Sequence, residues 1–301
     1  MNQRQNIAAG LFLAPNFLGF LIFTLLPVGA AMLLSLFRWD IFHAPQFVGF
    51  QNFVDLLGGH WRDGRFEWND PHFWKYLGNT AFLMMAIPVS MASSLFLAIM
   101  LNQQIRGRSF FRTIFYLPTI CAGVALLMLW KYMLNEEFGL VNRFLAVIGV
   151  DGPGWLTSYH WAKPAIMMVT IWTTMGGTNM ILYLAGLQCI PPELYEAAEI
   201  DGAGSWQAFT QVTWPLLSPT TFFIFITSVI HGLQGGFEAA YIMTEGGPDG
   251  ATTTMGYYIF NHAFQWFNMG YAAAIAMVLF VIILTVTLVN WRYGGRKVEY
   301  A

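Results

Sequence analysis

Six long apolar stretches constrain this chain more than any other feature: about 9–37, 77–101, 112–133, 164–188, 220–244 and 268–291. A helix needs roughly 20 apolar residues to cross the hydrocarbon core of a bilayer. Only 10% of the residues are charged, whereas a soluble domain has about a quarter. Within lipid the backbone must satisfy its own hydrogen bonds, which favours helices. We therefore expect an all-α membrane protein with six transmembrane helices in a single transmembrane domain, residues 1–301.

Basic residues in the short connectors predict the orientation of the chain. Loops rich in Lys and Arg stay on the cytoplasmic side. Such residues occur at the N-terminus, in the 102–112 connector and at the C-terminus, namely Arg4, Arg106, Arg108, Arg112, Arg292, Arg296 and Lys297. The first apolar stretch is longer than the apolar core of a signal peptide, so we expect it to be retained. Both termini are therefore expected to be cytoplasmic.

The connector 189–219 lies on the same side by alternation, yet it is acidic and has no Lys or Arg. It begins with prolines, carries carboxylates in its first turns and reaches glycines at 202 and 204, which is typical of a short helix and its end. Ser205 is a plausible N-cap of a second helix, which would present Trp206, Phe209 and Val212 on one face. The local pattern leaves two interpretations open: a hairpin on the headgroups, or a surface that docks into another protein.

A motif in this connector carries a resemblance. Glu196-Ala197-Ala198 is followed after three residues by Gly202 and after nine more by Val212, with Trp214-Pro215 at the end. This is similar to the EAA loop of ABC-importer permeases, EAA-x3-G-x9-I-x-L-P, with Val212 in place of Ile and Trp214 in place of Leu. Segments such as "FVGFQNFVDLL", "GLVNRFL" and "YIMTEGGPDGATTTMGYYIFNHAFQ" extend the likeness along most of the chain. The chain resembles the MalF/UgpA-like permeases of carbohydrate-uptake systems.

The resemblance implies a type I ABC-importer permease fold in a bacterial inner membrane. The implied partners are a second permease subunit, two cytoplasmic ATPase subunits, an extracytoplasmic solute-binding protein and a sugar. The resemblance also implies that the connector couples to the ATPase, with Glu196 facing a basic group, Gly202 permitting a sharp turn and Asp201 bracing it. The implied coupling residues are Glu196, Ala197, Ala198, Asp201, Gly202 and Pro215.

Polar residues within the apolar stretches are candidates for a substrate path, because ionisable and polar groups inside a membrane are commonly functional. On the fourth stretch Thr170, Thr174 and Thr178 recur every four residues, beside Asn179 and Tyr183. On the fifth, His231, Gln234 and Glu238 share one helical face. Interhelical hydrogen bonding is the alternative role. The middle of the stretches has no Lys or Arg, which favours a neutral polyhydroxylated solute; glycerol 3-phosphate or another polyol derivative is the alternative.

The sequence contains few features that would indicate an enzyme. The segment "TEGGPDGATTT" (244–254) lacks the pattern of a phosphate-binding loop, so ATP and magnesium are expected on partner ATPase subunits. The histidines are scattered, so no metal site is expected, and the net charge of −2 gives no reason to expect nucleic-acid binding.

Two rival hypotheses remain. One is a membrane-embedded enzyme using Glu196, Glu199 and Asp201. The other is a stand-alone channel or secondary transporter, which would be expected to have broken helices, and the sequence shows no clear sign of these. Loops 38–76 and 134–163 fit interface anchoring or contact with a binding protein.

Overall fold

A computed structural model of the chain describes residues 3–62, 64–121 and 123–294. The chain divides into two compact units: unit 1, Met1–Phe73 and Tyr258–Val281, and unit 2, Trp74–Tyr257 and Ile282–Ala301. The single transmembrane domain expected over residues 1–301 stays a prediction. The orientation of the chain also stays a prediction. Three of the basic groups on which it rests lie outside the described part of the chain, namely Arg296, Lys297 and the side chain of Arg4.

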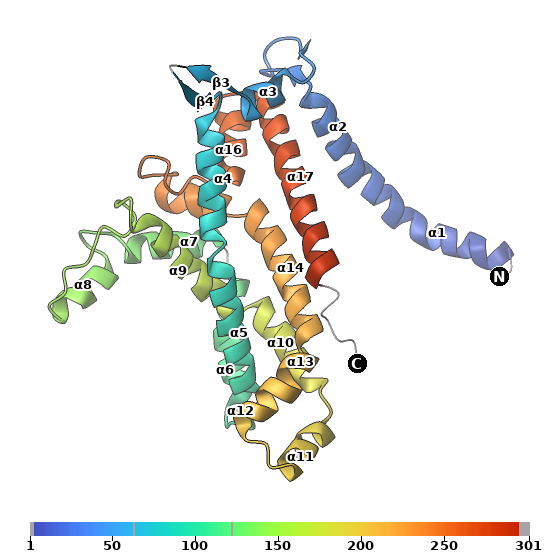
Figure 1. Ribbon diagram of the computed structural model, residues 1–301, viewed down its shortest axis with the longest axis vertical. Helices are drawn as coiled ribbons and strands as arrows, with labels where there is room; N and C mark the ends of the chain where they lie inside the picture. The colour runs from blue at the N-terminus through green and yellow to red at the C-terminus, as the bar shows by residue number, and fades with distance from the viewer. Residues whose placement is uncertain (1–2, 63, 122, 295–301) are drawn as a thin grey trace. The chain divides into compact units, whose positions relative to one another are not determined.

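Unit 1 combines apolar helix with two short antiparallel hairpins (Figure 1). The hairpins pair Phe37 with Phe47 and Gly59 with Trp68, so the all-α expectation holds except in this small loop region. The elements are α1 (Gln3–Phe20), a π-helical turn η1 (Leu21–Leu25), α2 (Leu26–Leu34), β1 (Phe37–Arg38), β2 (Gln46–Phe47), α3 (Gln51–Leu57), β3 (Gly59–Arg62), β4 (Arg65–Trp68), η4 (Asn261–Gln265) and most of the first half of α17 (Met269–Gly294).

The regular secondary structure in the described residues of unit 2 is helical, and loops connect the helices (Figure 1). Three helices are divided between the two units: α4 (Pro71–Leu83), α16 (Met255–Phe260) and α17, whose residues from Ile282 onward belong to unit 2. The others are α5 (Ala86–Asn102), α6 (Arg108–Ile120), α7 (Gly123–Met133), α8 (Leu140–Val147), α9 (Ala162–Met175), α10 (Thr178–Gln188), α11 (Pro192–Ile200), α12 (Ser205–Ala208), η2 (Phe209–Thr213), α13 (Trp214–Leu216), α14 (Ser218–Gln234), α15 (Phe237–Ala239) and η3 (Ala240–Thr244).

Within the described residues, three helical segments are long and apolar enough to cross a membrane: Phe12–Leu34, Pro71–Asn102 and Met269–Arg292. Three bent pairs pass the same test together, namely Arg108–Ile120 with Gly123–Met133, Ala162–Met175 with Thr178–Gln188, and Ser205–Leu216 with Ser218–Gln234. Counting each pair as one span gives six. The described residues therefore hold three such spans, or up to six if each bent pair is one span, and the predicted six is the upper end of this range.

Two expectations about these spans were wrong. The fifth span does not continue to residue 244, because α14 ends at Gln234 and the chain passes through Gly235-Gly236. Gly236 has φ +80, a left-handed conformation in which an α-helix cannot continue. Broken helices were not expected, yet three helix pairs are bent by 40° or more at a short break. Paired glycines, at 176–177 and 235–236, mark two of the points at which helices end.

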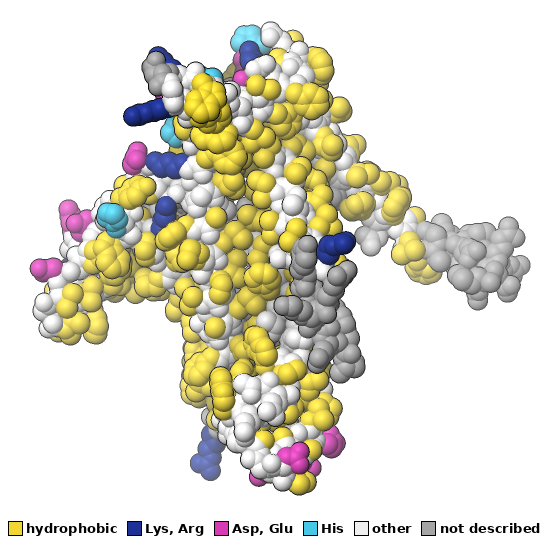
Figure 2. Space-filling view, in the orientation of Figure 1, with side chains coloured by type: hydrophobic (Ala, Val, Ile, Leu, Met, Phe, Trp, Pro, Cys, Tyr) yellow, Lys and Arg dark blue, Asp and Glu magenta, His cyan; other side chains and the backbone are white. Residues whose placement is uncertain are grey.

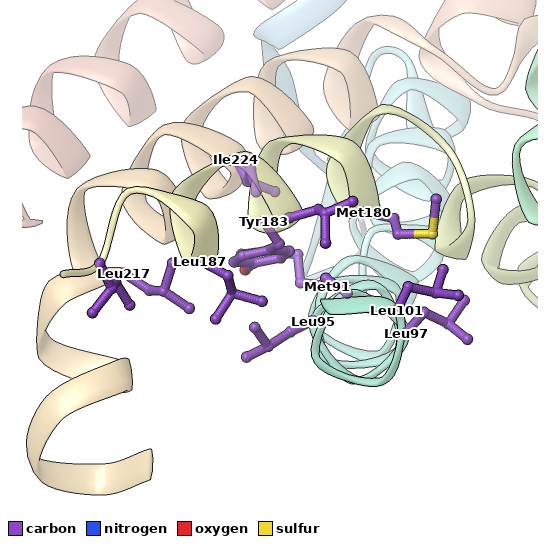
Figure 3. Close-up of a cluster of buried hydrophobic side chains, with 12 residues drawn as sticks. Met91, Leu95, Leu97, Leu101, Met180, Tyr183, Leu187, Leu217 and Ile224 are labelled. Atoms are coloured by element: carbon purple, nitrogen blue, oxygen red, sulfur yellow. The ribbon is translucent and has the colours of Figure 1, made fainter. Parts of the chain in front are cut away.

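The main hydrophobic core of unit 2 lies where α5, α10 and α14 meet (Figure 3). Its largest fully buried side chain is Tyr183, which is 1% exposed, with Met91, Leu95 and Met180 beside it. Small residues let these helices approach closely: Ser94 is fully buried, and at Gly186 a side chain would meet Leu217 and Thr220. This packing fixes the positions of the short helices that surround the cavity described below.

The segment 244–254 is a compact turn held to α4. The side chain of Asn79 donates to the carbonyl oxygens of Gly250 (2.8 Å) and Thr253 (3.0 Å). The backbone N–H of Met255 donates to Thr80 Oγ1 (3.0 Å), and Lys75 Nζ donates to the carbonyl oxygen of Asp249 (2.6 Å). Thr244 and Thr252 join the two ends of the turn through their hydroxyls at 2.6 Å.

Replacing Asn79 with leucine is expected to destabilise the chain. Asn79 is 4% exposed, and its loss leaves two carbonyls without their donor, at about 1–3 kcal/mol for each buried unpaired group. The thermal unfolding midpoint of the detergent-purified protein should fall by several degrees. Lys75→Met should lower the midpoint less, because the carboxylate of its partner Asp249 is 86% exposed and exposed ion pairs contribute about 0–1 kcal/mol. Equal midpoints for Asn79→Leu and wild type would contradict this role of the amide.

Candidate functional site

The first half of the acidic connector is the helix α11. Pro191 precedes it, Pro192 occupies its first turn and Glu193 lies in that turn, where the helix dipole favours a carboxylate. Gly202 has φ +78, and two backbone bonds close the helix end: Gly202 N–H to the carbonyl of Glu199 (3.0 Å) and Ala203 N–H to that of Ala198 (2.9 Å). A glycine in this conformation ends many helices. The sequence therefore folds into a helix and a sharp turn at the motif.

Asp201 sits at the C-terminal cap of α11, and its backbone N–H donates to the carbonyl of Ala197 (3.0 Å). Its side chain, like those of Glu196 and Glu199, is exposed. In the described part of the chain, none of these carboxylates forms an ion pair with Lys or Arg. Figure 2 shows Asp and Glu side chains gathered over this end of unit 2. The connector thus presents unneutralised negative charge outward.

The second half of the connector differs from the expectation in two ways. The N-cap of α12 is Gly204 rather than Ser205, because Gln207 Oε1 accepts a hydrogen bond from the Gly204 N–H (2.9 Å). The expected apolar face is also divided: Phe209 and Val212 pack against the hydrophobic core, while Trp206 is 74% exposed and stacks on Phe209.

The outward face of the connector is therefore apolar as well as acidic. Trp206 is joined there by Ile200, which is 87% exposed. A hydrogen bond between the hydroxyls of Tyr195 and Thr213 (2.9 Å) ties α11 to η2. The two halves of the connector are thus held together beneath this face.

A cavity of about 410 Å³ opens where α5, α9, α10 and α14 come together in unit 2. Its polar lining consists of Ser90, Thr170, Thr174, Asn179, Ser228 and His231, and its apolar lining includes Met84, Ile87 and Ile166. Thr174 Oγ1 lies 2.6 Å from Ser90 Oγ and donates to the carbonyl of Thr170 (2.7 Å). No Lys, Arg, Asp or Glu side chain lines it among the described residues. The cavity offers hydroxyl, amide and imidazole groups beside apolar surface.

The cavity brings together only some of the residues that the sequence singled out. Thr174, Asn179 and His231 line it, whereas Thr178, Gln234 and Glu238 are exposed outside the lining. The expected rows are broken because α9 ends at Met175 and α14 ends at Gln234, so a constant helical spacing does not carry across either break. Tyr183 belongs to the hydrophobic core instead of the cavity.

Sequence reasoning missed Ser90 and Ser228 in the cavity lining. Both are hydroxyl residues within long apolar stretches. The presence of a polar side chain in such a stretch is the signal that could have found them. Elsewhere, the described residues contain no group of three or more His, Cys, Asp or Glu side chains that could hold a metal ion.

Comparison with known proteins places the chain in a family. Residues 90–293 match the family described as the binding-protein-dependent transport system inner membrane component. The chain is 37% identical to the lactose transport system permease protein LacF of Rhizobium radiobacter, over 99% of this chain and 97% of the relative. It is 32% identical to the trehalose/maltose transport system permease protein MalF of Thermococcus litoralis, over 98% and 96%.

Solved structures agree with the sequence relatives. A chain of the bacterial alginate ABC transporter, in complex with an alginate pentasaccharide-bound periplasmic protein, matches with a TM-score of 0.85 and 26% identity, over 99% of this chain and 97% of that one. The relatives are permease subunits of ABC transporters rather than enzymes, which agrees with the lack of catalytic motifs in the sequence. The chain belongs to the binding-protein-dependent transport system inner membrane components and has the type I ABC-importer permease fold.

Proposed function

We propose that this chain is the permease subunit of an ATP-driven importer that takes up a neutral mono- or oligosaccharide delivered by an extracytoplasmic solute-binding protein. The observation that carries the proposal is the uncharged polar lining of the cavity between α5, α9, α10 and α14. Sugar hydroxyls both donate and accept hydrogen bonds, as do Ser90, Thr174 and Asn179. The apolar lining suits the CH faces of a sugar ring. The lactose and trehalose/maltose systems of the relatives support a sugar substrate.

Glycerol 3-phosphate is the second candidate. The chain is 31% identical to the sn-glycerol-3-phosphate transport system permease protein UgpA of Escherichia coli, over 96% of this chain. A phosphate is bound most strongly by Arg or Lys through charge-assisted hydrogen bonds, and the described lining of the cavity has neither. A second permease subunit would have to supply such groups. The charge of the lining therefore favours a neutral sugar.

Replacing cavity residues should reduce uptake without preventing assembly. In proteoliposomes that hold the whole importer and its binding protein, Asn179→Leu and His231→Leu are each expected to lower the initial rate of sugar uptake about tenfold, the loss of about 1.4 kcal/mol that a hydrogen bond to substrate contributes. Thr178→Val is the matched control, because Thr178 neighbours Asn179 outside the lining. The labelled solute would be chosen by screening the binding protein against lactose, maltose, trehalose and glycerol 3-phosphate.

Two outcomes of that experiment would count against the proposal. Equal uptake by Asn179→Leu, His231→Leu and wild type would remove the cavity from the path. Uptake of glycerol 3-phosphate in place of every sugar tested would replace the substrate class while keeping the path.

The connector 189–219 is, in this proposal, the surface that docks on an ATPase subunit in the cytoplasm, where both termini also lie. Glu196, Ala197, Ala198, Asp201, Gly202 and Pro215 form or shape this surface. Support comes from the exposed carboxylates and from Ile200 and Trp206, which present apolar area that no described residue covers. A polar rim around an apolar anchor suits a protein interface. The complete assembly would hold this chain, a second permease subunit, two ATPase subunits and the binding protein, which a mild-detergent purification with mass spectrometry would test.

A further inference from the structure

Unit 1 contains a second cavity, of about 490 Å³, that none of the preceding roles uses. Small-molecule sites commonly have volumes of roughly 300–1,000 Å³. Its walls come from two segments far apart in the sequence, 38–55 and 262–271. The lining is unusually polar for a loop region of so apolar a chain and includes Arg38, Asp40, Asn52, Asp55 and His262, with Trp39 beside them.

His262 is the residue that marks this cavity as a site. The side chain is 9% exposed, and neither ring nitrogen has a hydrogen-bond partner. Its ring packs against the rings of Tyr258 (4.6 Å), Trp266 (4.6 Å) and Tyr271 (4.7 Å). Buried polar atoms without a partner are rare in folded proteins. Burial lowers the pKa of His262 to about 4 despite the opposing charge of Asp70, so the ring is neutral near pH 7 and offers one donor and one acceptor.

The groups around His262 are held in place by bonds of their own. Asp70 Oδ2 accepts hydrogen bonds from the hydroxyls of Tyr258 (2.6 Å) and Tyr271 (2.7 Å), which fixes two of the rings. The side-chain amide of Asn52 donates to the carbonyls of Ser35 (2.8 Å) and Phe37 (2.9 Å), leaving its oxygen able to accept. A lining fixed in this way loses little entropy when a ligand binds.

The charges of the lining select the kind of ligand. The lining holds two carboxylates, Asp40 and Asp55, one guanidinium, Arg38, and the imidazole of His43. Asp40 also contacts His43 (2.6 Å), and Asp55 accepts from Gln51 (2.7 Å). This balance disfavours an anion, while carboxylates, amides and a guanidinium suit hydroxyl groups that both donate and accept. The indole of Trp39 adds an apolar face with a polar edge.

We infer that the unit 1 cavity is a second carbohydrate site, which binds a neutral polyhydroxylated ligand through Arg38, Asn52, Asp55 and His262. The inference rests on the proposed function, because it assumes that the imported solute is a sugar. By the proposed topology, segment 38–76 is extracytoplasmic, so the site takes up sugar before the sugar enters the spans. It is separate in sequence and in lining from the cavity of α5, α9, α10 and α14.

Protection of an introduced cysteine tests the site directly. Ala44 lies in the lining, and Ala44→Cys would be made in the assembled importer with Cys121 and Cys189, both exposed, changed to serine. Maltose or lactose alone should slow the labelling of Cys at 44 by a membrane-impermeant maleimide several-fold and saturably, and glycerol 3-phosphate should not. His160→Cys, exposed in loop 134–163, is the control and should label at the same rate with or without sugar.

His262→Phe keeps an aromatic ring but removes both ring nitrogens, so sugar should no longer protect position 44 while labelling without sugar stays unchanged. If His262→Phe reduces the amount of assembled importer, Arg38→Gln serves instead, because Arg38 is exposed. Protection that survives both variants would overturn the assignment.

The remaining outcomes are distinguishable. Protection by the sugar-free binding protein, with none by sugar alone, would make the cavity a contact for that protein and overturn a sugar site. Absence of protection in an importer that transports the same sugar overturns this inference alone. Failure to transport any sugar would overturn the proposed function and this inference with it.

Discussion

Replacing Glu196 with lysine should leave the chain in the membrane but separate it from its ATPase. Glu196 is exposed on α11 beside the tight turn at Gly202, and in the proposed complex it meets a basic group. Breaking a buried charge pair costs about 2–5 kcal/mol, and the lysine adds repulsion. The ATPase subunits should therefore bind at least about 30-fold more weakly, and transport should be lost. Co-purification of the ATPase with the tagged chain and its sugar-stimulated ATP hydrolysis measure both effects.

Glu137→Lys is the matched control, because it makes the same charge change at an exposed site in loop 134–163. It should leave ATPase association unchanged. Normal association and transport in Glu196→Lys would remove Glu196 from the coupling surface. Loss of the inserted chain itself would instead assign Glu196 to folding.

Adding a single methyl group at Gly176 should impair folding. Gly176 lies at the end of α9, and a Cβ there would collide with the backbone carbonyl oxygen of Phe115 in α6. Backbone atoms cannot turn aside as a flexible side chain can, and overpacking typically costs about 1–3 kcal/mol or more. The ratio of folded to unfolded Gly176→Ala should therefore fall by roughly 5- to 150-fold. Gel filtration of the solubilised chain, monitored by a fused fluorescent protein, would report this loss.

Gly78→Ala is the control, because a Cβ at this position of α4 meets no atom within 4 Å. Alanine also favours helix over glycine by about 1 kcal/mol, so this variant should be as stable as wild type or more so. An equal loss in both variants would show that helix packing tolerates neither glycine replacement and would refute the specific contact with Phe115.

The sequence predicted the spans well because their determinant is local. A run of apolar residues must lie in lipid or in a core wherever it occurs, so the six stretches correspond to three continuous candidate spans and three bent helix pairs. The turn at Gly202 was predictable for the same reason, since the glycine itself permits φ +78. Such features depend on a few adjacent residues.

The cavities were not predictable, because they depend on contacts between distant segments. Thr178 continued the four-residue spacing of the expected path and Tyr183 was expected beside it. The break at Gly176-Gly177 leaves Thr178 outside the lining, and the packing of α10 on α5 places Tyr183 in the core. His262 had no apparent significance as a lone histidine. Its burial comes from Tyr258, Trp266 and Tyr271, and its contact with a cavity comes from residues more than two hundred positions earlier in the chain.

The bonds between α4 and the 244–254 turn have a mechanical consequence. Lys75 and Asn79 bond to the turn at Asp249, Gly250 and Thr253, and Thr80 bonds to Met255, the residue that follows the turn. We therefore expect the turn to move together with α4 if this helix tilts, because none of these hydrogen bonds has to break for that movement.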